Sequence, residues 1–340
     1  MNQKTIVRKN VFSNLNDNIV RLFGILVALT VIIGIVKPEF LSIDNFQTIT
    51  SQMVVIGLLS LSNGICMISG GIDLSVVYIA NLSAILSGLY LKTHVTDGMS
   101  AGAEGLCILA TILIALAVGA LCGILNGVLV SYLRVPAMLA TLGSFELFYG
   151  LGIVFSNGSS ISDIPGSFSD FGTTMVFDTI PLPFFVFLAV AILLWFGMSR
   201  TKFGPRVYLV GTNMKASTFS GIRTNLILVR VYMLSGIIAS VAGLINLSNL
   251  NSAKADFGTS YTMQSILVAV LGGVDPNGGF GSIGGIVIAV FILQMLSSFL
   301  NMFPSISNFY RDLIWGVALI AVLIMNFVVT RRKIARQSKT

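Results

Sequence analysis

Stretches of about 20 apolar residues recur along the whole chain, and each is close to the length that a helix needs to cross the hydrocarbon layer of a membrane. Ten such spans are predicted, at residues 21–36, 47–68, 74–91, 105–132, 137–155, 181–198, 229–249, 262–274, 280–301 and 310–329. The chain is 55% hydrophobic and only 10% charged, whereas soluble domains carry about 25% charged residues. We therefore expect an all-α polytopic membrane protein with one transmembrane domain over residues 1–340.

The basic residues gather at one side of the predicted membrane. Sixteen of the 20 Lys and Arg residues fall in the leader 1–20 and its boundary, in the loop 199–230, beside the span ending at 132, and in the tail 330–340. Loops rich in Lys and Arg stay in the cytoplasm. Both termini are thus predicted to be cytoplasmic. The net charge of +7 follows from topology and does not indicate a nucleic-acid partner.

The segment from Arg200 to Arg230 is the most basic loop. It carries six basic residues and no acidic one: Arg200, Lys202, Arg206, Lys215, Arg223 and Arg230. Connections of this length are usually functional or disordered. We interpret it as a docking element for a soluble partner; the alternative is a solvated connector whose charges only fix topology. On the outer side, the polar loop Ser156–Ile180 is either a contact for an external partner or a plain cap.

Glycines repeat at helical spacing within one span. Gly119, Gly123 and Gly127 recur every fourth residue, which lets a neighbouring backbone approach closely. A glycine face indicates that another helix packs closely on it, but it does not identify the chain to which that helix belongs. We therefore favour packing inside one subunit over a dimer contact.

Two connections share the pattern Gly-Gly-x-Asp. They are Ser69-Gly-Gly-Ile-Asp-Leu-Ser-Val76 and Leu271-Gly-Gly-Val-Asp-Pro-Asn-Gly-Gly-Phe-Gly-Ser282. Paired glycine interruptions point to broken helices beside a substrate route. The residues of this prediction are Gly70, Gly71, Asp73, Ser75, Gly272, Gly273 and Asp275. Capping or acceptance from loop amides is favoured for the two aspartates over a role in proton movement.

Glu146 lies inside an apolar span. An intramembrane carboxylate is a candidate functional residue, and the alternative is a carboxylate that faces the bundle interior and hydrogen-bonds a neighbour. The two alternatives stay open.

The sequence lacks the motifs of nucleotide binding and of hydrolytic catalysis. Residues 279–284 spell G-x-G-x-x-G, but neither the preceding strand nor the following acid of a dinucleotide site is present. The chain has no G-x-x-x-x-G-K-[ST] phosphate loop, and no H-E-x-x-H or G-x-S-x-G for a hydrolase. We expect no catalytic residue, no metal site and no cofactor in this chain. Cys66, Cys107 and Cys122 fall in apolar segments and show no disulfide framework.

Four motifs in order resemble a known family. They are residues 69–76, Val135-Pro-Ala-Met-Leu-Ala-Thr-Leu-Gly143, Gly211-Thr-Asn-x-x-Ala216 with Ser220-Gly-Ile222, and Val270-Leu-Gly-Gly with Gly-Gly-Phe-Gly-Ser282. The chain is similar, over residues 40–328, to the permeases of bacterial ABC importers of the ribose type. It departs from the family pattern at Val77-Tyr78, at Tyr149 and at Glu146. These departures bear on which substrate is carried and not on membership of the family.

The resemblance implies a set of partners and a docking site. It implies a second permease copy or sister permease, a separate cytoplasmic ATPase that binds ATP and Mg, and a periplasmic or lipid-anchored sugar-binding protein. It implies docking on the ATPase through Gly211, Asn213, Ala216, Ser220 and Gly221. The location implied is the bacterial inner membrane, in contact with lipid.

The main hypothesis is thus an importer permease for a monosaccharide or small polyol. The alternative is an ion-coupled secondary transporter that uses Asp73, Glu146 and Asp275 as relays. The sequence identifies no substrate-contacting side chain.

Overall fold

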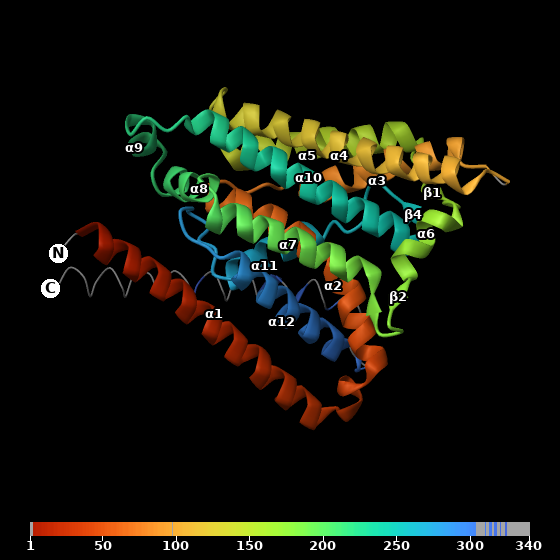
Figure 1. Cartoon of the computed structure of the whole chain (residues 1–340), viewed down its shortest axis with the longest axis horizontal. Helices are drawn as coiled ribbons and strands as arrows, with labels where there is room; N and C mark the ends of the chain where they lie inside the picture. The colour runs from red at the N-terminus through yellow and green to blue at the C-terminus, as the bar shows by residue number, and fades with distance from the viewer. Residues whose placement is uncertain are drawn as a thin grey trace.

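The chain folds into a bundle of helices that run along one common direction (Figure 1). The computed structural model describes residues 3–96 and 98–303 with a few positions from 310 to 324, and for residues 3–17 it describes the backbone alone. The predicted span 310–329, apart from those positions, the tail 330–340 and Asp97 lie outside the described residues.

Helices make up most of the described chain, and short strands lie in some of the connections between them. In chain order the elements are α1 (Gln3–Val36), the 3-10 helix η1 (Pro38–Leu41), α2 (Ile43–Ile68), α3 (Val76–His94), α4 (Ala101–Ser131), α5 (Ala137–Ser156), β1 (Ile161–Ser162), α6 (Gly166–Thr173), β2 (Met175–Val176), β3 (Ile180–Pro181), α7 (Leu182–Arg200), α8 (Phe203–Thr212), α9 (Met214–Phe219), α10 (Thr224–Leu250), β4 (Ser252–Ala253), α11 (Tyr261–Leu271) and α12 (Ile283–Asn301).

Short elements mark the two ends of the bundle. Helices α8 and α9 and the start of α1 lie at one end, and α6 with β1, β2 and β4 lies at the other (Figure 1). We call these the α9 end and the α6 end. Strand β1 pairs with β4 and β2 with β3, both antiparallel.

The described residues contain eight helices that are long and apolar enough to cross a membrane. They match eight of the predicted spans. The predicted span at 262–274 is instead the helix α11 of 11 residues. At 1.5 Å per residue α11 is about 16 Å long, roughly half of the ~30 Å hydrocarbon layer. It is the broken segment of the fold.

Helix α2 is the centre of the bundle. Its most apolar window is 89% buried, against 28% for α4, α5 and α7 and 11% for α1. It packs against α7, α10, α11 and α12. The exposed apolar side chains of α1, α4, α5 and α7 are those expected to face lipid, because no water-facing globule would expose so many.

The glycine face of α4 lies against α10 of the same subunit. A Cβ at Gly119 would lie 2.4 Å from the Gly236 carbonyl oxygen, and one at Gly123 would lie 2.2 Å from that of Tyr232. A Cβ at Gly127 would lie 2.7 Å from the Val229 Cα. The two backbones thus touch along this face.

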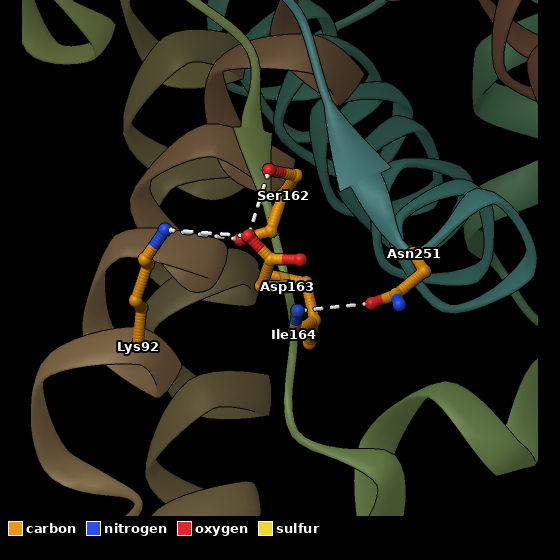
Figure 2. A network of polar contacts seen from close by, with 5 residues as sticks. All are labelled: Lys92, Ser162, Asp163, Ile164 and Asn251. Atoms are coloured by element: carbon orange, nitrogen blue, oxygen red, sulfur yellow. Dashed lines mark hydrogen bonds and ion pairs between the residues drawn. The ribbon is translucent and has the colours of Figure 1, made fainter.

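Hydrogen bonds fasten the outer connection 157–181 at the α6 end. Asn251, which follows α10, accepts a hydrogen bond from the Ile164 amide at 2.9 Å. The Lys92 ammonium, on α3, donates to the Ser162 carbonyl at 3.3 Å and lies 4.0 Å from the Asp163 carboxylate (Figure 2). The outer connection, for which a partner contact and a plain cap were the alternatives, is therefore an ordered cap of strands and one short helix.

Candidate functional site

The basic segment folds into two short helices, α8 and α9, and the start of α10. Asn213 separates α8 from α9, and its Oδ1 accepts a hydrogen bond from the Ala216 amide at 2.9 Å, the usual N-cap of a helix. At the other end of α9, Gly221 has a φ of +79°, which favours glycine. Ser220 Oγ donates to the Ala216 carbonyl at 2.9 Å. Four of the five residues predicted for docking thus build the ends of α9.

The positive charges of this segment are available to a partner. None of its six basic residues forms an ion pair with any described residue. Arg206, Arg223 and Arg230 line one cavity of about 520 Å³, whose rim includes Ser220 and Gly221. This cavity suits an acidic group of a soluble partner.

Phe219 is a surface residue that the sequence motifs do not mark. It ends α9 and is 92% exposed. Large aromatic side chains are enriched at protein interfaces. The signal available in the sequence is an aromatic residue among polar and basic neighbours.

Three separate segments meet through their backbones at the α9 end. The Gly279 amide donates to the Ile68 carbonyl at 2.8 Å. A Cβ at Gly211, on α8, would lie 2.0 Å from that same oxygen, and a Cβ at Gly278 would lie 2.6 Å from the Gly70 Cα. We call Gly70, Gly211, Gly278 and Gly279 the glycine junction. It joins the end of α2, the end of α8 and the α11–α12 connection.

A tyrosine adds a side-chain link to the junction. Tyr208 Oη, on α8, donates to the Gly281 carbonyl at 2.9 Å. Burial raises the pKa of Tyr208 to about 12, so that the hydroxyl remains a donor at neutral pH. The sequence shows no signal for this contact, because 73 residues separate the partners.

Each Gly-Gly-x-Asp segment leaves its helix through one glycine with a positive φ, but at different positions of the motif. It is the first glycine, Gly70, after α2 (φ +93°) and the second, Gly273, after α11 (φ +89°). Asp73 Oδ1 accepts from the Ser75 amide at 2.9 Å, and Asp275 Oδ1 accepts from the Asn277 amide at 2.9 Å. Both aspartates therefore accept from loop amides, the alternative that the sequence favoured.

The other glycines of each pair allow close packing. A Cβ at Gly71 would lie 2.3 Å from the Tyr232 hydroxyl, and one at Gly272 would lie 2.7 Å from the Ile286 backbone. Both connections are thus pressed against neighbouring helices, α10 and α12.

Asp73 and Ser75 lie in a buried polar network. The Asn63 side chain accepts from the Asp73 amide at 3.2 Å and donates to Ser265 Oγ on α11 at 3.0 Å. Ser75 Oγ donates to Asp73 Oδ1 at 2.6 Å and accepts from Asn126 on α4 at 2.8 Å. Because side chains from α2, α4 and α11 converge here, the α2–α3 connection is fixed from several sides.

The three candidate relay carboxylates lie in different surroundings. Asp73 is fully buried, Asp275 is half-buried in the α11–α12 connection, and Glu146 is exposed on α5. Glu146 is exposed on α5, and a Cβ at Gly143, about one turn earlier, would meet nothing within 4 Å, so the carboxylate does not face the interior of this chain's own bundle. Within the described part of the chain, no three His, Cys, Asp or Glu side chains are grouped for a metal ion.

These features together define a multi-pass membrane protein whose basic segment contacts the connections that follow α2 and α11. The family described as "branched-chain amino acid transport system / permease component" matches residues 45–323. The chain belongs to this family of permeases.

Named relatives agree with that assignment. The chain is 30% identical over 301 residues to the autoinducer 2 import system permease protein LsrC of Yersinia pseudotuberculosis serotype O:3 (strain YPIII), covering 88% of this chain and 82% of the relative. The LsrC protein of Yersinia pestis (strain Pestoides F) matches with the same identity and coverage. No solved structure matches the chain.

The predicted class is thus confirmed: the chain is a permease subunit of an ABC importer, a transport component and not an enzyme. The alternative of an ion-coupled secondary transporter is not supported. The family implies an ATPase and a binding protein as partners.

Proposed function

We propose that this permease imports a monosaccharide or related small polyol across the bacterial cytoplasmic membrane, with the α9 end and both termini in the cytoplasm. Support for the substrate class comes from relatives named as autoinducer 2 importers and from the motifs of the ribose-type branch. Support for the orientation comes from the six basic residues at the α9 end, none of which is ion-paired with a described residue.

The observation that carries the mechanism is the glycine junction. In the proposed cycle, the ATPase holds α8 and α9 through Phe219 and the arginine-lined cavity. Because Gly211 lies directly on the end of α2 and on Gly279, a displacement of α8 acts on both broken connections. The spans connected to them, α2, α3, α11 and α12, then move relative to the rest, which is alternating access. ATP and Mg bind to the ATPase and not to this chain.

The outer end is proposed to receive the binding protein. The ordered cap formed by residues 157–181 presents Phe177, which is 90% exposed. A second copy or a sister permease completes the pathway, and Glu146 on the exposed face of α5 is a candidate contact for it, because a carboxylate in lipid requires a partner.

Two matched substitutions test the assignment of the two ends. Phe219→Asp and Phe177→Asp each replace a phenylalanine with at least 90% exposure, so neither removes a core contact. We expect the tagged wild-type chain to co-purify with its ATPase, Phe219→Asp to lose the ATPase, and Phe177→Asp to retain it. Binding of the substrate-binding protein should show the reverse pattern.

Uptake into proteoliposomes distinguishes transport driven by ATP from transport driven by an ion gradient. The proposal requires uptake that depends on ATP and survives Asp275→Asn and Glu146→Gln. If uptake instead follows a proton or sodium gradient and these variants abolish it, the proposed mechanism is wrong.

A further inference from the structure

A cavity of about 580 Å³ lies at the α6 end, between α2, α6, α10, α11 and α12. Its size falls in the range of roughly 300–1,000 Å³ that is usual for small-molecule sites. The half-length helix α11 begins on its wall, at Tyr261. The cavity therefore reaches from the outer cap down to the broken helix.

Side-chain amides dominate the polar lining of this cavity. Its lining includes five of them: Gln52, Asn246, Asn249, Gln264 and Gln294. None of the described lining residues is charged, whereas the other two cavities contain arginines or a Lys, Glu and Asp set. Each amide offers both a donor and an acceptor, which matches a hydroxyl group.

Two of these amides are already oriented by each other. Gln294 Nε2, on the buried side chain, donates to Gln52 Oε1 at 2.7 Å. The pair leaves the Gln52 NH₂ group as a donor and the Gln294 Oε1 as an acceptor, neither of them hydrogen-bonded to a described residue. Because each amide restricts the other, a ligand hydroxyl would meet a preorganised partner.

Asn249 is a third amide on the cavity wall, but its oxygen is closed to a ligand. Asn249 Oδ1 is buried, accepts no hydrogen bond from the described residues and packs against Gly172 of α6, where a Cβ would come within 2.6 Å of it. The rings of Phe257 and Tyr261, 5.9 Å apart and edge to face, add apolar surface beside the amides.

We propose that this cavity is the substrate site of the outer half of the pathway, and that it binds small uncharged polyhydroxylated molecules through the Gln52–Gln294 pair and Gln264. The inference rests on the proposed function as an importer permease. It goes further by placing the substrate contacts and by setting a charge rule.

The charge rule separates this substrate class from amino acids, which the family description names. A zwitterion needs a partner for its carboxylate and another for its ammonium group. The start of α11 offers partial positive charge to a carboxylate, but the described lining holds no carboxylate for an ammonium group. Burying an unpaired ammonium is costly.

Cysteine labelling in intact cells tests the site without relying on transport. In a Cys107→Ser background, Gln264→Cys places a thiol in the cavity, and Gln47→Cys places one at a half-buried position near the start of α2, outside it. Both should react with a membrane-impermeant methanethiosulfonate reagent. The probes are D-ribose, D-xylose and D-galactose as neutral sugars, and L-leucine and D-glucuronate as charged solutes.

We expect at least one neutral sugar to slow the labelling of Gln264→Cys and to leave Gln47→Cys unchanged, with no effect of the charged solutes. Ser297→Cys, on α12 in the same cavity, serves if Gln264→Cys does not reach the membrane. Protection by leucine, no labelling of either cavity position, or labelling with no protection by any sugar would each overturn the proposal.

Uptake of the protecting sugar supplies the second readout. Gln52→Leu should lower its uptake about five- to tenfold, the effect of one lost hydrogen bond. Thr48→Val, at an exposed position of α2 outside the cavity, should stay within about twofold of wild type. Equal uptake by Gln52→Leu and wild type would contradict the assignment of the amide pair. Sugar protection without ATP-dependent uptake would instead leave the cavity assignment standing and refute the proposed energy coupling.

Discussion

Asp73 is a buried carboxylate whose observed contacts are those of a structural acceptor. Its Oδ1 accepts from both the amide and the hydroxyl of Ser75. An asparagine oxygen can accept the same two bonds, so we expect Asp73→Asn to fold and to transport at close to the wild-type rate. Asp73→Ala leaves the buried Ser75 amide without a partner, and we expect a loss of about 1–3 kcal/mol of unfolding free energy.

Thermal unfolding of the purified chain in detergent, together with ATP-driven uptake, checks this prediction. Asp275→Ala is the matched control, because Asp275 makes the same turn but is half-buried; we expect a smaller loss there. A folded Asp73→Asn chain that does not transport would indicate proton movement through this carboxylate instead.

At this scale the sequence predicts local contacts well and long-range ones poorly. The turns of Asp73 and Asp275 follow from residue types two positions apart, and both are observed. Two tyrosines at departures from the family pattern, Tyr78 and Tyr149, lie on different helices, yet their rings are 5.8 Å apart. Phe145 lies 4.1 Å from Tyr78 in the same cluster. Only the packing of α3 on α5 shows that the departures belong together.

Among the helices, the contact of α8 with the end of α2 carries the proposed coupling. Gly211→Ala places a methyl group 2.0 Å from the Ile68 carbonyl oxygen, so the junction must open. We expect the variant to lose ATP-driven uptake, with a loss of about 1–3 kcal/mol from overpacking. Gly143→Ala, in α5, is the matched control, since its Cβ would meet nothing within 4 Å.

Both substitutions gain about 1 kcal/mol in helix propensity, so a comparison of the two isolates the contact. Uptake and the melting temperature are measured on the same preparations. If Gly211→Ala transports as well as Gly143→Ala, the junction does not transmit the movement of α8.

The helix boundaries show what hydropathy can and cannot supply. Eight spans agree with the structure to within a few residues, because an apolar run of about 20 residues has few alternatives in a membrane. The same hydropathy rule predicts α11 as a short membrane span. It does not show that this helix of 11 residues crosses only about half of the hydrocarbon layer. It also misses that Gly211 and Gly279 touch, since their contact depends on how three connections converge.

The molecule as a whole is polarised in charge. Six basic residues without ion pairs to described residues lie at the α9 end. Both ion pairs of the described chain, Lys92–Asp163 and Lys254–Asp256, lie near the α6 end. An exposed pair of this kind adds little stability, so the distribution reflects topology more than folding. From the rule that basic loops stay inside, we predict that the α9 end is cytoplasmic.

Reactivity of two engineered thiols measures that orientation directly. In the Cys107→Ser background, Cys66 and Cys122 remain buried, so each engineered thiol is the accessible one among the described residues. We expect an impermeant maleimide to label Phe177→Cys in intact cells and Phe219→Cys only after the membrane is permeabilised. Since both side chains have at least 90% exposure, unequal labelling reports sidedness and not burial. The reverse pattern would place the arginine-lined cavity outside, where no ATP-driven partner could reach α9.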